Sequence, residues 1–374
     1  MARSSKAFPR VKLSGSHLDI GRQYGEHFKD RIAEHLELAL NNLQKRGVKA
    51  DDALDRALRY RPFVQQHAAF LDEEIVGLAE GAALSLAQAY VLQLRAEVLK
   101  TPQELKDEPG DECTTYAIEP AASKHGESFL GQNADLPPFY ADIGVVIDID
   151  APDHPNVIMV TPAGQISYIG MNEHGFAVGA NYLTCDGWTL GVPRYLLSRM
   201  VLTCNTVTEA ATLLNSLPRA SSRNIIMIDP QGQALDVETI PSTTGQVHPK
   251  DGILAHSNHF LAPDLTRFER AKAEEFDNSQ IRVATMRKLL TADRGNLTLD
   301  KLMAIMRNRD TVPDALCRHP GERPGQTSTI AAMIAQPSQR TLWVAIGPPD
   351  KHLFHGYTFG KDTVQVEKEE VSYA

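Results

Sequence analysis

The sequence predicts an α+β fold in which two sheets lie between two layers of helices. Three observations support this prediction. Helical periodicity fills the first third of the chain, strand composition begins at Cys113, and strands and helices then follow one another in blocks. Strands, then a helix pair, then strands, then helices is an order compatible with two sheets faced by two helical layers.

The N-terminal part is expected to be helical. Residues 17–100 alternate apolar and polar residues at helical spacing, as at Ile32 and Leu36. Gly21 and Gly25 lie four residues apart within the first expected helix, where each glycine costs about 1 kcal/mol relative to alanine. We therefore expect another element to pack closely over that face.

Short strands are expected after a charged segment at residues 101–111, which is interpreted as an exposed loop that delivers Cys113. The expected strands lie at residues 116–118, 128–132, 144–149, 157–160, 176–181, 224–228, 234–238, 253–257, 329–334 and 341–346. The expected helices lie at residues 193–202, 206–217, 265–275, 280–290 and 298–306.

Composition excludes several classes of protein. The chain has 374 residues, of which 42% are hydrophobic and 23% are charged, and this is ordinary globular composition. The net charge of −9 argues against a nucleic-acid partner, which requires a basic face. No secretory signal and no apolar run of membrane-spanning length is found. The four cysteines lack metal-like or disulfide-framework spacing, so we expect a cytoplasmic protein with reduced thiols and neither metal nor cofactor.

Cys113 is the candidate nucleophile. It lies in a polar run, 111–116, at the change from helices to strands. A thiolate is the reactive form of cysteine, and a free thiol with a pKa of about 8.5 is only partly ionised at neutral pH. If the Glu112–Cys113 bond breaks, the new α-amine, with a pKa of about 7.7–8.0, can act as the base for the thiol on the same residue. The alternative is a small buried apolar side chain.

Asp135 is the candidate acid beside this thiol. Asn133 and Asp135 are two residues apart, so in a regular strand they share one face. A carboxylate near an α-ammonium group would orient that group and tune its pKa. The alternative is an aspartate that ends a strand, because prolines follow at 137–138.

Several short motifs occur in a characteristic order. They are Leu13–Ser16 with Gly21 and Gly25, Cys113–Thr115, Gly131–Asp135, Gly170–Gly175, Asn181-Tyr182, Gly191–Pro193 and Ser257–Phe260. In this order, over nearly the whole chain, they resemble the acyl-coenzyme A:6-aminopenicillanic acid acyltransferase family of N-terminal-nucleophile hydrolases. Two positions depart from the family pattern. Glu112 precedes the nucleophile where glycine is frequent, and Gly325-Gln326 falls opposite a Ser-Arg pair of penicillin-type members.

The resemblance implies roles for five residues. Cys113 would be the nucleophile and Asp135 the catalytic aspartate. The side-chain N–H of Asn258 would face the oxyanion, where one such donor is worth about 2.7–4 kcal/mol. Asn181 would donate through its backbone N–H, and Arg267 resembles an arginine found near the thiol in bile-salt hydrolases. The alternatives are a loop amide, a strand-end residue and a surface arginine, respectively.

Three aromatic residues are the candidates for the substrate pocket. Trp188 lies in a loop expected to cover the pocket, and Phe139 and Tyr140 are expected to complete the acyl or amine subsite. His256 and His259 flank Asn258, but no cysteine or carboxylate lies at ligand spacing from them.

Together these features predict a helical segment, 1–112, packed on an N-terminal-nucleophile domain, 113–374, with a four-layer αββα sandwich. The predicted function is a self-cleaving cysteine amidohydrolase that acts on a linear amide through a Cys113 thioester. Its partners would be a small amide or acyl substrate and its own N-terminal fragment in a heterodimer. The alternatives are a coenzyme A-dependent N-acyltransferase and a non-catalytic binding protein on the same fold.

Overall fold

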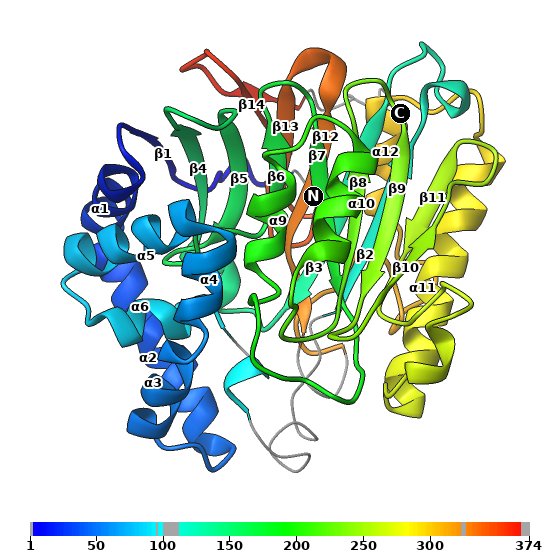
Figure 1. Ribbon diagram of the computed structural model, residues 1–374. Coiled ribbons are helices and arrows are strands. Elements are labelled where there is room, and N and C mark those ends of the chain that lie inside the picture. The colour runs from blue at the N-terminus through cyan, green and yellow to red at the C-terminus, as the bar shows by residue number, and fades with distance from the viewer. Residues whose placement is uncertain (1–2, 95, 100–111, 323–326, 368–374) are drawn as a thin grey trace.

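The computed structural model describes residues 3–94, 96–99, 112–322 and 327–367. In this part of the chain two sheets stack face to face, with helices on both outer sides (Figure 1). The first sheet has the strand order β1-β4-β5-β6-β7-β8-β9-β10, and the second has the order β11-β2-β3-β12-β13-β14-β15. All neighbouring pairs are antiparallel except β1 and β4, which run parallel.

The strands are β1 (Arg10–Ser14), β2 (Glu112–Ile118), β3 (Phe129–Leu136), β4 (Gly144–Asp150), β5 (Val157–Pro162), β6 (Ile169–Asn172), β7 (Ala177–Tyr182), β8 (Arg223–Ile228), β9 (Ala234–Thr239), β10 (Thr244–Val247), β11 (Ile253–His256), β12 (Ser328–Gln336), β13 (Thr341–Ile346), β14 (His355–Thr358) and β15 (Gln365–Val366). The α-helices are α1 (His17–His27), α2 (Lys29–Lys45), α3 (Ala50–Leu58), α4 (Arg61–His67), α5 (Ala69–Ala82), α6 (Leu86–Leu92), α8 (Tyr140–Ile143), α9 (Leu196–Val201), α10 (Val207–Ser216), α11 (Ala273–Ala292) and α12 (Leu299–Met306).

Three hydrophobic clusters fill the spaces between the layers. The first lies between the helices α1–α6, α9 and α10 and the outer face of the eight-stranded sheet. The second lies between the two sheets and contains Cys113. The third lies between the seven-stranded sheet and the helices α11 and α12. Because every face of both sheets is covered, most strand residues are buried on both sides, which explains their near-continuous apolar composition.

The structure confirms the predicted α+β four-layer sandwich. Several helices and strands begin or end at residues other than those predicted. The N-terminal segment is not purely helical, since it also contributes β1, which pairs with β4 at the edge of the first sheet. β3 continues to Leu136, so Asp135 lies inside a strand rather than after one. A helix was expected at residues 265–275, but a short 3-10 turn at Thr266–Phe268 precedes α11. The expected loop at residues 101–111 lies outside the described residues.

Close packing of α1 against α5 confirms the expectation from the spaced glycines. A Cβ atom built at Gly21 would lie 2.0 Å from the carbonyl oxygen of Glu74 in α5. Gly77 of α5 is equally close to α1, because its Cβ would lie 2.1 Å from the carbonyl oxygen of Leu18. Backbone therefore meets backbone at this crossing, and no side chain larger than hydrogen fits at either glycine.

Replacement of Gly21 by alanine is expected to destabilise the protein. The new methyl group would force the two helices apart, and overpacking of this kind costs about 1–3 kcal/mol or more. Urea unfolding measures the change, and Glu26→Ala, an exposed position of the same helix, is the matched control. Equal unfolding midpoints for the two variants would contradict the observed helix crossing.

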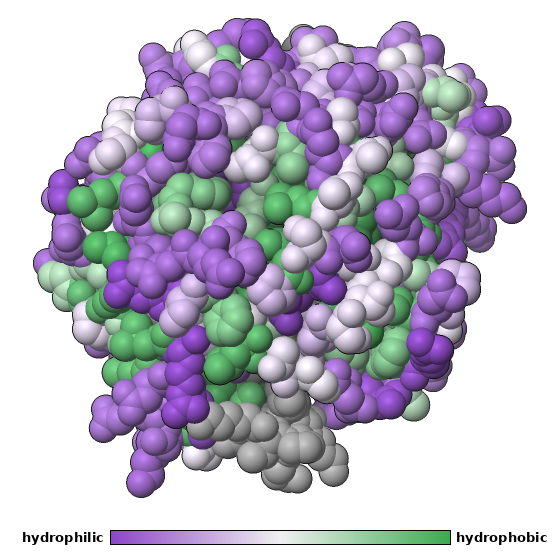
Figure 2. Space-filling view, viewed as in Figure 1, coloured by the Kyte–Doolittle hydropathy of each residue, from purple (hydrophilic) through white to green (hydrophobic). Residues whose placement is uncertain are grey.

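Figure 2 shows hydrophilic residues over much of the visible face, with hydrophobic residues mainly in patches between them. Among the described residues, no single helix is both long and apolar enough to span a membrane. The helix pair α5 and α6 meets such a test of length and composition only when taken together, and it is bent by 114°.

Candidate active site

The site is built around the backbone of Cys113 near the start of β2. β11 pairs with β2 only as far as His256, which lies opposite Thr115. Beyond that point side chains replace the missing strand. The backbone N–H of Cys113 donates to Oδ1 of Asn258 over 2.8 Å. Because β11 ends before this point, the backbone N–H of Cys113 is bonded to a side chain and not to the backbone of a neighbouring strand on that edge.

The carbonyl oxygen of Cys113 accepts hydrogen bonds from three side chains. Nδ2 of Asn181 donates over 3.0 Å, Oγ of Ser257 over 3.1 Å and Nη1 of Arg282 over 2.6 Å. Asn181 reaches across from β7 of the other sheet, and its Oδ1 accepts from the hydroxyl of Thr115 at 2.8 Å. Both sheets and α11 thus hold the nucleophile residue, which is the fixed positioning that covalent catalysis requires.

The thiol of Cys113 lies in the apolar space between the sheets. Its Sγ is 3.8 Å from the hydroxyl oxygen of Tyr168. Tyr168 and Tyr195 are members of the same cluster. The guanidinium of Arg223 lies 4.6 Å from the ring centroid of Tyr195 and 5.8 Å from that of Tyr168. A buried cation therefore lies close to the tyrosine that contacts the thiol.

Asp135 lies on β3, in register with Glu112 of β2, and is fully buried. Its Oδ1 accepts a hydrogen bond of 2.7 Å from the hydroxyl of Thr329. Burial raises the pKa of Asp135 to about 7, while the positive charge of Arg282 and the Thr329 hydrogen bond act in the opposite direction. Near neutral pH this carboxyl can therefore both take up and release a proton.

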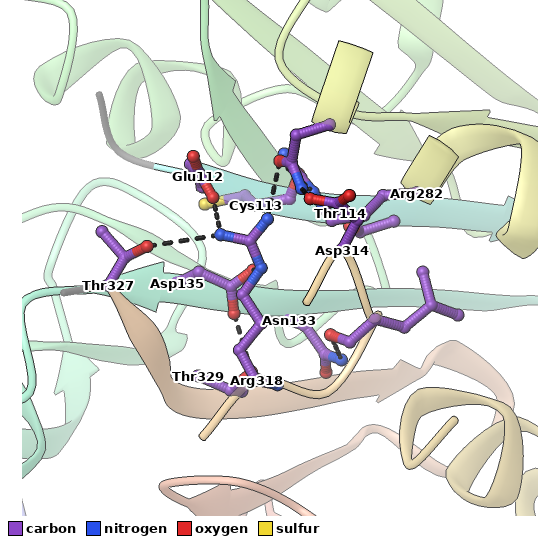
Figure 3. A network of polar contacts seen from close by, with 12 residues as sticks. Glu112, Cys113, Thr114, Asn133, Asp135, Arg282, Asp314, Arg318, Thr327 and Thr329 are labelled. Carbon is purple, nitrogen blue, oxygen red and sulfur yellow. Dashed lines mark hydrogen bonds and ion pairs between the residues drawn. The ribbon is translucent and has the colours of Figure 1, made fainter. Parts of the chain in front are cut away.

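Arg318 connects the residue before the nucleophile with Asp135 (Figure 3). Its Nη1 forms an ion pair with the carboxylate of Glu112, and its Nε lies 3.6 Å from Oδ2 of Asp135. Nη2 donates to Oδ1 of Asn278 over 2.6 Å. Only 1% of the Arg318 side chain is exposed, so these interactions occur away from water, where charge pairs are strong.

A second layer of groups fixes Asn258. Its backbone N–H donates to Oγ of Ser279 over 2.6 Å, and the same hydroxyl lies 2.7 Å from Nδ1 of His259. Burial lowers the pKa of His259 to about 4, so the ring is neutral and its Nδ1 can accept the Ser279 proton. On the other side of Asn258, His256 lies 2.7 Å from the carboxylate of Glu238.

The structure brings four of the five proposed catalytic residues together. Nδ2 of Asn258 donates to the carbonyl oxygen of Tyr182 over 3.0 Å, and Oδ1 is the atom that accepts from the backbone of Cys113. The side chain of Asn181 donates to the carbonyl oxygen of Cys113. Both asparagines therefore hold the backbone of Cys113, and their role at an oxyanion stays a prediction.

The arginine beside Cys113 is Arg282 rather than Arg267. Arg267 is exposed, and its guanidinium lies 4.9 Å from the ring centroid of its neighbour Phe268. Arg282 is fully buried in α11 and also donates to Oδ1 of Asn258 over 2.9 Å. Arg282 was not among the predicted site residues, although it lies on the same helical face as the buried Val283 and Met286. An arginine on an apolar face was the available signal.

The expected pocket residues lie in two different places. Phe139 and Tyr140 stack with ring centroids 4.3 Å apart and pack in the cluster that contains Cys113. Trp188 packs in other clusters. It reaches the site only indirectly, because the guanidinium of Arg194 lies 5.3 Å from its ring and 5.2 Å from the ring of Tyr195.

Two groups of side chains in the described residues could hold a metal ion, and neither includes the catalytic candidates. One consists of His17, Asp153 and His154, and the other of Cys317, His319 and Asp350. In each group the potential ligand atoms lie within 4.8 Å of one another. In the second group, Asp350 is already bonded to both Cys317 and His319.

Two stacked sheets between helical layers, with a cysteine near the start of β2, next to the edge strand β11, are the arrangement of the N-terminal-nucleophile hydrolase fold. The chain belongs to the acyl-coenzyme A:6-aminopenicillanic acid acyl-transferase family, whose model matches residues 122–351. It is therefore one of a group of enzymes that act on acyl or amide bonds. The match begins after Cys113, so the role of this thiol depends on the geometry described above.

The chain is also similar to several individual proteins. The chain is 27% identical over 347 residues to the acyl-coenzyme A:6-aminopenicillanic-acid-acyltransferase 40 kDa form of Emericella nidulans, covering 91% of this chain and 93% of that protein. Conjugated bile acid hydrolase from Clostridium perfringens, as its C2A mutant, is 12% identical with a TM-score of 0.46, covering 69% of this chain and 97% of the other. Penicillin V acylase from Agrobacterium tumefaciens is 12% identical with a TM-score of 0.43, covering 63% and 83%, respectively.

Proposed function

We propose that the chain is a precursor that cleaves itself between Glu112 and Cys113 and then acts as a cysteine amidohydrolase on linear amides. The observation that carries this proposal is the arrangement around Cys113. Its backbone nitrogen is bonded to Oδ1 of Asn258, and its carbonyl oxygen is bonded to three side chains. Buried backbone groups outside a ladder need hydrogen-bond partners, but here one carbonyl oxygen has three side-chain donors, one of them a buried arginine. Such fixed positioning suits a nucleophile.

Self-cleavage begins at the thiol. Sγ of Cys113 attacks the carbonyl carbon of Glu112, and a thioester forms as the C–N bond breaks. The thiol proton passes to the nitrogen of Cys113, which becomes the α-amine. Water then attacks the thioester and gives the new carboxylate of Glu112 and the free thiol. Asp135 lies opposite Glu112 in the register of β2 and β3, and its pKa of about 7 suits a proton carrier for these steps.

The cleaved enzyme repeats the same chemistry on a substrate. The α-amine takes the proton of the thiol, which attacks the substrate carbonyl. The amine product leaves with that proton, and water hydrolyses the acyl thioester. Oδ1 of Asn258, which accepts the N–H of Cys113 in the intact chain, would accept from the α-amine and orient it.

The N-terminal fragment is expected to remain bound after cleavage. It supplies β1 to the eight-stranded sheet, and its helices bury Ile20, Tyr24 and Ile32 in the cluster on that sheet. Burial of side chains of this size contributes about 1.5–3 kcal/mol each. The proposed mature protein is therefore a heterodimer of residues 1–112 and 113–374.

An N-acyltransferase is the second candidate function, and the family assignment and the Emericella nidulans relative favour it. The two candidates share the Cys113 thioester and differ only in the acceptor. Gly325-Gln326, which falls opposite the Ser-Arg pair of penicillin-type members, lies outside the described residues.

The acceptor can be identified with purified, cleaved protein and a series of N-acyl-p-nitroanilides. We expect release of p-nitroaniline in buffer alone, at a rate that 6-aminopenicillanic acid does not increase and without a new amide product. Turnover that requires 6-aminopenicillanic acid and an acyl-coenzyme A donor, with no anilide cleavage in water, would contradict hydrolysis and support the transferase.

The pKa of Asp135 predicts a pH dependence of stability. Its folded pKa of about 7 lies above the ordinary value of 3.8, so the folded state binds this proton more tightly than the unfolded state. The resulting stabilisation is present below about pH 4 and is lost as the pH rises towards 7, at up to roughly 1.4 kcal/mol per pH unit.

Urea unfolding between pH 4 and pH 8 measures this effect. Cys113→Ala and the double variant Cys113→Ala/Asp135→Asn form a matched pair, because both chains are expected to stay uncut. The first should lose stability relative to the second as the pH rises from 4 to 7. A constant difference between the two variants over this range would contradict the raised pKa.

A further inference from the structure

The Glu112–Arg318 ion pair indicates which chemical group the substrate carries on its acyl side. Glu112 is the residue whose carbonyl group is attacked in the proposed self-cleavage, so its side chain occupies the acyl side of the first bond that Cys113 breaks. Its carboxylate is bound by Arg318, which is almost fully buried (Figure 3). In the precursor, residue Glu112 therefore occupies the place of the acyl group of a substrate, and its side-chain carboxylate is bound by Arg318.

Cleavage changes the charge balance around Arg318. In the intact chain the carboxylates of Glu112 and Asp135 both face this guanidinium. Once Glu112 becomes the C-terminus of the N-terminal fragment, it must leave this place before a substrate can reach the thiol. The remaining carboxyl, Asp135, lies 3.6 Å from Nε of the guanidinium, whereas Glu112 was bound at Nη1, so the Nη1 side loses its carboxylate. Arg282 and the new α-ammonium group add further positive charge nearby.

A buried cation that loses a charged partner destabilises the protein strongly, because the remaining charge is left in a medium of low dielectric constant. An anionic group on the substrate would restore the balance. Arg318 is also held for this task, since its Nη2 donates to Oδ1 of Asn278 and its Nη1 lies 3.3 Å from the hydroxyl of Thr327. Such an arginine keeps the geometry needed to bind a carboxylate.

We propose that Arg318 is the substrate-binding residue for a carboxylate on the acyl group, and that Glu112 fills this subsite in the precursor. The inference rests on the proposed hydrolysis of amides through Cys113. In a glutamate residue three carbons separate the carbonyl carbon from the side-chain carboxylate. The matching substrates are amides of five-carbon dicarboxylic acids, of which glutaryl amides are the simplest.

The test compares glutaryl-p-nitroanilide with pentanoyl-p-nitroanilide, which has the same carbon chain without the carboxylate. For cleaved wild-type enzyme we expect kcat/KM to be about 10- to 100-fold higher for the glutaryl compound, since hydrogen bonds to charged groups contribute about 1.5–3 kcal/mol. Arg318→Met should bring this ratio close to one. Arg223→Met, which removes a different buried arginine near Tyr168, should leave the ratio unchanged.

Three results would overturn the assignment. Equal or faster hydrolysis of the pentanoyl compound by wild-type enzyme would remove the anion subsite while leaving the proposed hydrolase intact. Loss of the ratio in Arg223→Met instead of Arg318→Met would place the subsite elsewhere. Failure of processed enzyme to hydrolyse any anilide would contradict the proposed function, and the subsite with it.

A binding measurement avoids reliance on the Arg318 variant. Calorimetric titration with glutarate is expected to show saturable binding to cleaved wild-type protein. Uncut Cys113→Ala protein, in which Glu112 still occupies Arg318, should bind glutarate at least 10-fold more weakly. Equal binding to the two proteins, or none to either, would overturn the proposal.

Discussion

Cys113→Ala is expected to abolish amide hydrolysis. The thiol is the only group in the proposed mechanism that forms a bond to the substrate, and loss of a nucleophile from a comparable hydrolase lowers kcat by about 10⁶-fold. The fold should survive, because a buried cysteine packs as a small apolar side chain and alanine differs from it by one atom. The measurement is p-nitroaniline release by the variant at a concentration that gives full turnover in wild type.

Cys204→Ala is the matched control for this prediction. Burial raises the pKa of the Cys204 thiol to about 11, so it is not a thiolate at neutral pH. Its loss should leave hydrolysis unchanged, and iodoacetamide should inactivate the wild-type enzyme by labelling Cys113. Full hydrolysis by Cys113→Ala would contradict Cys113 as the nucleophile. Four cysteines that react slowly and equally would instead support the non-catalytic alternative.

Arg282→Met is expected to have the second largest effect, in both stability and rate. Its guanidinium donates to the carbonyl oxygen of Cys113, the hydroxyl of Thr114 and Oδ1 of Asn258. Removal takes a charged donor away from each of these buried acceptors, and a hydrogen bond to a charged group contributes about 1.5–3 kcal/mol. Because the same contacts position the nucleophile, we expect kcat to fall by at least about 100-fold, since misplacement by even 1 Å can cost that much.

Arg267→Met tests which arginine acts on Cys113, because the sequence predicted Arg267 and the structure places Arg282 there. The side chain is exposed, so its replacement should change kcat by less than about threefold and stability by less than about 0.5 kcal/mol. Both variants are measured for kcat, KM and urea unfolding. A large loss in Arg267→Met together with a small one in Arg282→Met would reverse the assignment made here.

The sequence identified those parts of the site that lie in local motifs. Cys113, Asp135, Asn181 and Asn258 each lie in or beside a short strand, and the resemblance of their motifs to the family placed them in one site. The two-sheet architecture was predictable for the same reason, because alternating blocks of strands and helices leave few arrangements. The glycine pair in α1 correctly indicated a close helix crossing.

The parts that could not be predicted depend on long-range packing. Arg282 lies 169 residues from Cys113 in sequence, and only the orientation of α11 decides that it faces the nucleophile while Arg267 faces solvent. The orientation of Asn258 was unpredictable for a related reason. Its amide could present either N–H or C=O to Cys113, and the choice is set by the carbonyl oxygen of Tyr182 and by Arg282.

The central claim is that the chain cuts itself before Cys113, and the mass of freshly purified protein tests it most directly. Wild-type protein should give two fragments, residues 1–112 and 113–374, with cysteine at the start of the larger one. Cys113→Ala protein, prepared in parallel, should give one uncut chain. A single uncut chain in fully active wild-type protein would contradict the account, because the thiol would then lack the α-amine on which the mechanism depends.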